Sequence, residues 1–283
     1  MRIISSIKTM QEFSESSRLS GKTIALVPTM GFFHQGHLKL MEEGRKRADL
    51  LIVSIFVNPT QFGVGEDLET YPRDLERDKG LSQSVGVDVV FTPSAMEMYP
   101  KGHQTYVNVE EVTKNLCGVS RPTHFRGVAT IVVKLFNIIR PHIAFFGEKD
   151  FQQLVTIRQM AKDLNFDIKI VGVPTFREKD GLAMSSRNVY LNPEERRAAL
   201  SLNRAIDTAS YLFNSGERST ENLIREAKKE IESETLTKID YFIVCDSQTL
   251  EDIDVINREA VLAIAVRVGE TRLIDNLIFK SIE

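Results

Sequence analysis

Cysteine is scarce in this 283-residue chain, which contains only Cys117 and Cys245. Two cysteines so far apart in the sequence provide neither a disulfide framework nor a CxxC metal or redox pair. Long hydrophobic runs are also missing, because apolar stretches such as 50–57 are of strand length and too short to span a bilayer. Residues 1–8 lack the apolar core of a signal peptide. We therefore expect a cytoplasmic protein with no membrane-embedded part.

An excess of basic charge is missing as well. The chain has 36 Lys and Arg against 39 Asp and Glu, for a net charge of −3. Nucleic-acid binders usually carry a pronounced basic surface, so we expect no nucleic-acid partner. Hydrophobic residues make up 42% of the chain and charged residues 27%, which is typical of a folded globular protein. At this length the core belongs to one large domain or two smaller ones.

The first two thirds of the chain alternate short β-branched runs with longer helical patterns. This alternation is typical of βαβ units around a parallel sheet. The pattern predicts strands at 23–28, 50–57, 87–91, 143–146 and 168–173, and helices at 37–47, 73–85, 128–140 and 151–164.

The pattern changes near residue 190. Asn192 and Pro193 form a helix start, and helices are predicted at 193–213 and 220–235. Strands follow at 239–245, 261–268 and 273–279, with a hairpin turn at Gly269-Glu270. We predict an α/β protein with a Rossmann-like parallel-sheet domain at 1–176 and a smaller α+β C-terminal domain at 177–283.

The densest polar cluster lies at 28–37, where the first strand leads into the first helix. Ligands of open α/β sheets bind at this end of the strands, and helix-start amides bind anions. Gly31 and Gly36 permit tight turns, and His34 and His37 lie three positions apart. Both histidines are also compatible with an ordinary helix start, and zinc is a weaker alternative because no further ligand completes a site. The placement after a buried strand favours a nucleotide.

The segment 147–150 follows the predicted strand at 143–146 in the same way. Lys149 can bind a phosphate as a point charge at the strand's end. The alternative is a solvated loop in which Asp150 caps the next helix.

Two further segments have suitable chemistry. Residues 181–188 contain hydroxyls and Arg187, which suit phosphate recognition, although a flexible interdomain linker has the same composition. Asn58 and Gln61 follow the second strand and offer neutral amides to a carboxylate or hydroxyl, or simply form a turn. The loop at 117–127 is equally compatible with a surface loop and an anion-contacting segment.

Taken together, these segments resemble a known family. His34-Gln-Gly-His37 with Met184-Ser-Ser-Arg187 resembles the HIGH and KMSKS pair of the nucleotidyltransferase superfamily. More specifically, the chain resembles the pantothenate synthetase (pantoate–β-alanine ligase) family over essentially its whole length. Six segments carry this resemblance in the family's order: 28–37, 58–62, 71–74, 117–130, 145–153 and 180–188.

The resemblance implies a two-step ligase reaction. ATP and (R)-pantoate form pantoyl adenylate and pyrophosphate, and β-alanine then attacks the adenylate to give pantothenate and AMP. It also implies Mg²⁺ with the ATP, and a homodimer. Asp78 is a possible Mg²⁺ contact, but we assign no protein ligand because Mg²⁺ often keeps its waters and binds substrate phosphates.

The same resemblance implies which residues act. His37 is implied as the proton donor, and the positive end of its helix favours a neutral imidazole there. Lys149 is implied to offset charge on the pentavalent phosphorus, while Gln61 and Gln153 orient pantoate and Gln61 lies near β-alanine. The implied ATP-binding residues are Met30, Gly31, His34, Gly36, His37, Gly147, Lys149, Asp150, Phe176, Met184, Ser185, Ser186 and Arg187.

The chain departs from the family pattern at Gln35, at Phe32-Phe33 and at Thr123. The KMSKS loop has no direct lysine equivalent here, because Ser186 and Arg187 end the motif, so the positive charge must come from Lys149 and Arg187. The alternatives are a nucleotidyltransferase acting on a phosphate ester, a class I aminoacyl-tRNA synthetase, and an ATP-sensing dimer without chemistry. Neutral Asn58, Gln61 and Gln153 suit a small hydroxy acid better than a phosphate ester.

Overall fold

The computed structural model describes residues 1–63 and 65–280. These residues form two compact units. The first unit contains 1–148 and 156–174, and the second contains 149–155 and the chain from Thr175 onward. The boundary expected between 176 and 177 stays a prediction. No helix within the described ranges is both long enough and apolar enough to cross a membrane.

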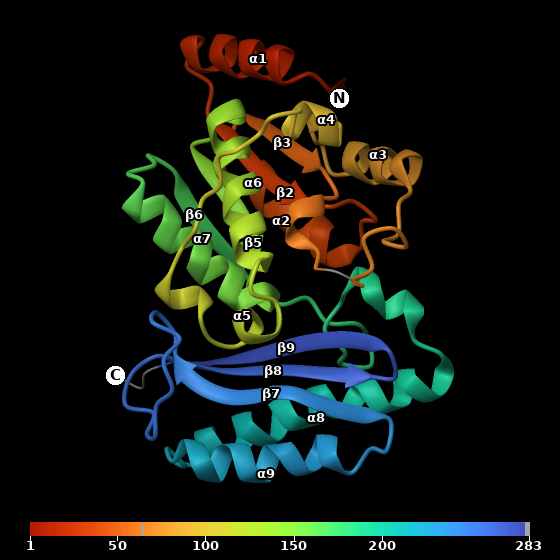
Figure 1. Ribbon diagram of the computed structural model, residues 1–283, viewed down its shortest axis with the longest axis vertical. Helices are drawn as coiled ribbons and strands as arrows, with labels where there is room; N and C mark the ends of the chain where they lie inside the picture. The colour runs from red at the N-terminus through yellow and green to blue at the C-terminus, as the bar shows by residue number, and fades with distance from the viewer. Residues whose placement is uncertain (64, 281–283) are drawn as a thin grey trace. The chain divides into compact units, whose positions relative to one another are not determined.

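The first unit is built on a parallel six-stranded sheet in the order β1-β4-β3-β2-β5-β6. Helices and short turns connect the strands (Figure 1). The elements up to residue 174 are β1 (Arg2–Ile4), α1 (Ile7–Leu19), β2 (Ile24–Thr29), α2 (Gln35–Arg45), β3 (Leu50–Ile55), η1 (Pro59–Gln61), α3 (Leu75–Ser84), β4 (Val89–Phe91), α4 (Ala95–Met98), η2 (Glu111–Thr113), α5 (Cys117–Ser120), α6 (His124–Ile139), β5 (Ile143–Gly147), η3 (Glu148–Asp150), α7 (Phe151–Asp163) and β6 (Lys169–Val173). Of these, the part of η3 and α7 from Lys149 to Val155 belongs to the second unit.

The strand order has a reversal between β2 and β5. The chain runs outward from β2 through β3 to β4 on one side, and from β5 to β6 on the other. β2 and β5 are nevertheless parallel neighbours, with Ala25 paired to Ile143 and Leu26 to Ala144. In open α/β sheets ligands bind at the carboxyl ends of the strands at such a reversal. The loops after these two strands are therefore the topological candidates for a site.

The central strands of this sheet are apolar and buried. β2 and β3 contribute fully buried side chains such as Ala25, Val27, Leu51 and Val53. Continuous apolar runs are expected for parallel strands buried on two sides. This is why the runs after residues 23 and 50 predicted strands correctly.

The second unit is an α+β structure, as expected. Its elements are η4 (Ser186–Tyr190), α8 (Pro193–Asn214), α9 (Thr220–Glu232), β7 (Thr237–Asp246), β8 (Ala260–Val268) and β9 (Thr271–Phe279). The strands pair antiparallel in the order β7-β8-β9. Figure 1 shows α8 and α9 along one side of this sheet, and alternate strand residues such as Leu262, Ile264 and Val266 share a core with Leu202 and Leu223 of the two helices.

The predicted fold class is confirmed, although several elements differ from their predicted bounds. β1 was missed because it has only three residues, paired with β4. α1 was missed because serines occupy part of its buried face, where Ser14 and Ser17 lie beside Met10. α6 begins at His124, four residues earlier than predicted, because Gly127 belongs to its first turn rather than to a loop.

Candidate active site

The turn after β2 is held in an unusual backbone conformation by one buried carboxylate. Gly31 and Phe32 have positive φ values of +85° and +51°. The N–H groups of Phe32 and Phe33 donate to the two carboxylate oxygens of Asp78, each at 2.7 Å. A Cβ on Gly31 would lie 3.0 Å from Asp78 Oδ2, so glycine is needed for this close approach. The start of α2 is therefore positioned by a residue of α3.

Asp78 is 1% exposed, and burial raises the pKa of its carboxyl, against the lowering effect of the two amide hydrogen bonds. The sequence suggested Asp78 as a possible Mg²⁺ contact. Each of its oxygens accepts from a main-chain amide, which gives this carboxylate a structural role.

The two histidines lie together at the start of α2. His34 is the N-cap residue and has extended backbone. Its N–H donates to Nδ1 of His37 at 3.3 Å, and the centroids of the two rings are 4.0 Å apart. Because Nδ1 of His37 accepts a hydrogen bond, a neutral ring carries its proton on Nε2. His37 is thus arranged to donate from Nε2.

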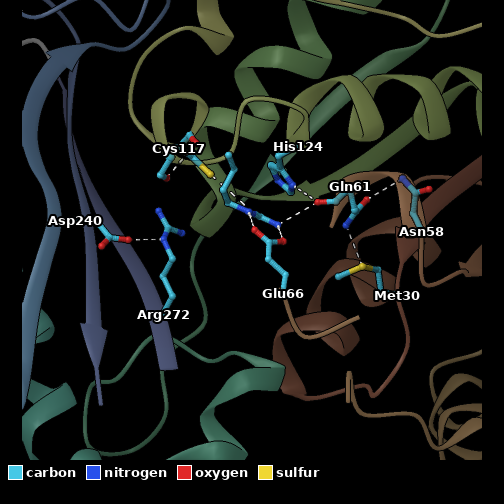
Figure 2. Close-up of polar contacts among 10 residues, drawn as sticks. Met30, Asn58, Gln61, Glu66, Cys117, His124, Asp240 and Arg272 are labelled. Atoms are coloured by element: carbon cyan, nitrogen blue, oxygen red, sulfur yellow. Dashed lines mark hydrogen bonds and ion pairs between the residues drawn. The ribbon is translucent and has the colours of Figure 1, made fainter. Parts of the chain in front are cut away.

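Gln61 has a defined amide orientation that follows from its neighbours. Asn58, which is 1% exposed, donates from Nδ2 to the carbonyl of Gly127 at 3.1 Å, and a carbonyl can only accept. Nδ2 of Asn58 also donates to Oε1 of Gln61 at 3.1 Å, while Tyr99 donates to Oδ1 of Asn58. Nε2 of Gln61 therefore lies on the other side, 3.0 Å from the sulfur of Met30 (Figure 2). Gln61 therefore presents its amide donor on the side of Met30.

The main chain of Gln61 is held by the loop that the sequence left undecided. Arg121 Nη2 donates to the carbonyl of Gln61 at 3.1 Å, and Nδ1 of His124 lies 2.8 Å from the same oxygen. Arg121 also pairs with Glu66 through Nε at 2.6 Å and Nη2 at 2.5 Å. Burial alone would raise the pKa of the Glu66 carboxyl. The hydrogen bonds from Arg121 nevertheless hold this pKa below its usual value. Arg121 is therefore used inside the protein and positions Gln61.

Apart from Gly147, the remaining expected site residues belong to the second unit. Lys149 and Gln153 are half-buried and Asp150 is exposed. Phe176 and Met184 are joined by a main-chain hydrogen bond of 2.9 Å, and Arg177 forms an antiparallel bridge with Ala183. Residues 176–184 thus form a short hairpin that precedes the Ser-Ser-Arg segment.

The Ser-Ser-Arg segment itself is a turn closed by its own first residue. The side chain of Ser185 caps η4 by accepting from the N–H of Arg187 at 3.3 Å. Ser186 is buried, with 7% of its surface exposed. This segment therefore forms a short 3-10 helix with its own cap.

The hairpin is fixed to α8 by ion pairs. Arg196 donates to Glu178 at 2.8 Å and to Asp180 at 2.6 Å, and Asn188 donates to Glu178 at 2.6 Å. Burial opposes ionisation of Glu178, but Arg196 and Asn188 hold the pKa of its carboxyl below the usual value. Nothing in the local sequence indicated these contacts.

The structure thus groups the expected residues within each unit. Met30 and Gln61 are in contact, and Gly31, His34, Gly36 and His37 surround the start of α2. Gly147 ends β5, the strand next to β2. Lys149, Asp150 and Gln153 belong to the second unit, together with Phe176, Met184, Ser185, Ser186 and Arg187.

A parallel sheet with a glycine turn, a helix start and two histidines after its central strand defines an α/β nucleotide-binding enzyme. The model of the pantoate-beta-alanine ligase family matches residues 2–278, and the chain belongs to that family. The protein is a ligase that joins pantoate to β-alanine with ATP as a substrate, as the resemblance implied.

Three similar proteins illustrate the match. Pantothenate synthetase of Syntrophus aciditrophicus is 60% identical over 99% of this chain and 98% of its own. The crystal structure of pantothenate synthetase from Thermus thermophilus superimposes with a TM-score of 0.93 at 43% identity, covering 98% of this chain and 99% of that one. The enzyme from Francisella tularensis, complexed with beta-gamma ATP and beta-alanine, has a TM-score of 0.79 at 33% identity over 98% and 97% of the two chains.

Proposed function

We propose that the reaction proceeds through a pantoyl adenylate. The pantoate carboxylate attacks the α-phosphorus of ATP and pyrophosphate leaves. The amine of β-alanine then attacks the acyl carbon, and AMP leaves as pantothenate forms. Negative charge spreads over phosphoryl oxygens in the first step, so catalysis depends on positioning and fixed positive potential.

In this proposal the start of α2 binds the nucleotide phosphates. The first-turn amides and the positive end of the helix attract anions, with His34 and Gly36 beside them. His37 donates a hydrogen bond from Nε2 as a neutral imidazole. The hydrogen bond from the His34 N–H to Nδ1 of His37 supports this assignment, because it leaves the proton on Nε2.

Gln61 and Gln153 orient pantoate, and Gln61 also lies near the incoming β-alanine. The donor orientation of Gln61, fixed by Asn58 at 3.1 Å, is the observation that carries the pantoate assignment. A neutral donor held in place suits a hydroxy acid whose carboxylate must remain free to attack.

Lys149 offsets charge on the pentavalent phosphorus, while Ser185, Ser186 and Arg187 bind the ATP phosphates. The other residues of the proposed ATP site are Met30, Gly31, Gly147, Asp150, Phe176 and Met184. The turn closed by Ser185 supports a binding role for this segment. We also propose a functional boundary after residue 176, with 1–176 as the catalytic domain and 177–283 as a lid.

Mg²⁺ enters as the Mg·ATP substrate in this proposal. The described residues contain no cluster of three His, Cys, Asp or Glu side chains able to hold a metal, and Asp78 is engaged by amides. This donor set does not fit a protein-held ion, so the ATP phosphates supply its ligands.

The remaining parts of the proposal concern the setting of the enzyme. Its partners are small-molecule substrates, with no nucleic acid and no membrane, and it acts in the cytoplasm as a homodimer. Sedimentation equilibrium tests the last point, since a dimer has twice the 32.0 kDa mass of the chain.

Isotope exchange tests the adenylate. With ATP, Mg²⁺ and pantoate, but without β-alanine, labelled pyrophosphate should exchange into ATP. AMP should accumulate only when β-alanine is added. A pyrophosphate exchange that requires β-alanine would contradict an adenylate formed before β-alanine reacts. Transfer of AMP to a phosphate ester would favour a different nucleotidyltransferase.

A further inference from the structure

The last strand of the chain contacts the segment that carries Lys149. Asn276 of β9 donates from Nδ2 to the main-chain carbonyl of Lys149 at 2.9 Å. The two residues are 127 positions apart in the sequence and belong to the same compact unit. Asn276 is 8% exposed and pairs across the sheet with Ala263.

Only Asn276 can be the donor in this hydrogen bond. A main-chain carbonyl accepts hydrogen bonds and cannot donate them, so the side-chain amide of Asn276 must place its NH₂ group toward Lys149. A carboxylate of the same shape could not make the contact. The requirement at this position is therefore for a donor.

The ammonium group of Lys149 is not held by an ion pair in the described part of the chain. Among the described residues, no carboxylate forms an ion pair with its ammonium. A lysine side chain is long and flexible, and holding it in one geometry costs rotamer entropy. The reach of the ammonium therefore depends on where the main chain of Lys149 is held, and Asn276 donates a hydrogen bond to that main chain.

Asp275, the residue before Asn276, makes further hydrogen bonds at the same point of β9. Asp275, which is 2% exposed, accepts from the N–H of Asn276 at 2.8 Å and from both terminal nitrogens of Arg177 at 2.6 and 3.0 Å. Adjacent strand residues point to opposite faces of a sheet. Asp275 thus connects the same point of β9 to the hairpin at 176–184, which precedes the Ser-Ser-Arg segment.

We propose that Asn276 is a positioning residue for Lys149. By fixing the Lys149 carbonyl, it places the ammonium where charge develops on the α-phosphorus during adenylation. Asp275 holds that point of β9 rigid and ties it to Arg177. This inference rests on the proposed role of Lys149 and adds a residue that does not itself touch substrate.

A double-mutant cycle in the full-length enzyme tests the proposal. Asn276→Ala should lower the single-turnover adenylation rate by about 10- to 100-fold, the range expected for a displacement near 1 Å, while changing the Kd of ATP by less than about 3-fold. In a Lys149→Ala background the same change should lower the rate by less than about 3-fold, because the group it positions is absent.

Two further variants separate positioning from folding. Asn276→Asp keeps the shape but loses the donor, and it should be at least as impaired as Asn276→Ala. Thr237→Val removes side-chain hydrogen bonds of 2.7 and 2.9 Å to the carbonyls of Ile231 and Glu234 in the same unit. It should lower the thermal midpoint and leave the adenylation rate unchanged.

The outcomes are distinguishable. An equal fold-loss from Asn276→Ala in the wild-type and Lys149→Ala backgrounds would overturn the positioning role while leaving the role of Lys149 intact. If Lys149→Ala adenylates at the wild-type single-turnover rate, Lys149 does not have the proposed role. Asn276 then has no positioning role either. An Asn276→Asp enzyme with the wild-type adenylation rate would also overturn the proposal.

Discussion

Lys149 is a half-buried lysine whose ammonium has no carboxylate partner among the described residues. We expect Lys149→Ala to lower the adenylation rate by about 100-fold, because a fixed charge at the reacting phosphorus is worth more in the transition state than in the ground state. ATP affinity should change much less. Rapid-quench single-turnover kinetics measure the first quantity and equilibrium titration the second.

The matched control is Lys162→Ala, which removes an exposed lysine from α7. It should leave both quantities unchanged. Unaltered single-turnover chemistry in Lys149→Ala would remove this residue from the mechanism.

Gln61 makes a second residue-level prediction. Gln61→Ala should raise the KM of pantoate by about 10-fold, the value of one hydrogen bond of about 1.4 kcal/mol, with little effect on ATP. Steady-state kinetics with each substrate varied in turn provide the measurement, and Gln11→Ala, an exposed glutamine in α1, is the control. An unchanged pantoate KM would place the pantoate site elsewhere.

At the scale of elements, α8 begins with a complete capping box. The side chain of Asn192 accepts from the N–H groups of Glu194 and Glu195 at 2.9 Å, and Glu195 accepts in return from the N–H of Asn192 at 3.0 Å. Asn192→Ala should lower the free energy of unfolding by about 1 kcal/mol, measured by urea titration. Asn214→Ala, at the other end of α8, should change it by much less.

The contact between α6 and η1 gives another element-level prediction. A Cβ on Gly127 would lie 2.3 Å from the carbonyl oxygen of Thr60, so Gly127→Ala must push η1 away. The unfolding free energy should fall by about 1–3 kcal/mol, and pantoate KM should rise because Gln61 is part of η1.

Gly80→Ala is the control for that substitution. Gly80 lies in α3, and a Cβ added there would have no other atom within 4 Å, so alanine should stabilise the helix by about 0.5–1 kcal/mol. A stable Gly127→Ala enzyme with normal pantoate KM would show that η1 does not depend on this contact.

At the scale of the whole molecule, His142 links the two halves of the parallel sheet. Its Nδ1 accepts from the N–H of Ile24 at 2.9 Å, which joins the start of β2 to the residue before β5. Burial, together with the nearby charge of Arg18, lowers the pKa of His142 below 6.5. The neutral ring is therefore the form that the fold selects.

The consequence is a pH-dependent stability. A group whose pKa is lowered on folding stabilises the fold above its unfolded pKa, and this contribution is lost as the pH falls through the folded pKa. The wild-type protein should lose unfolding free energy between pH 7 and pH 5, and His142→Gln should lose less. Urea titrations across this range test it, and parallel pH profiles of the two proteins would contradict it.

The fold was largely predictable because local signals were strong. The runs that became β2 and β3 are apolar throughout, and Asn192-Pro193 predicted the start of α8 correctly. β1 and α1 were missed because a three-residue strand and a helix with buried serines carry little hydrophobic pattern.

The candidate site was predictable only in part. His34, His37 and Gln61 follow predicted strands, so their neighbourhood could be named from the chain. The groups that hold these residues could not be named in this way. Asp78 contacts Phe32 over a separation of 46 residues, and Arg121 contacts Gln61 over a separation of 60 residues. No periodicity relates residues at such separations.

By itself, the sequence determined the α/β class, the family and the candidate site segments, since these depend on local runs and on motifs in order. Only the tertiary structure decided which side chains are placed by others. The donor orientation of Gln61 follows from Asn58, and the main chain of Lys149 is held by Asn276. The physical reason is that hydrogen bonds depend on distance and direction in space, which strand pairing and helix packing establish between distant parts of the chain.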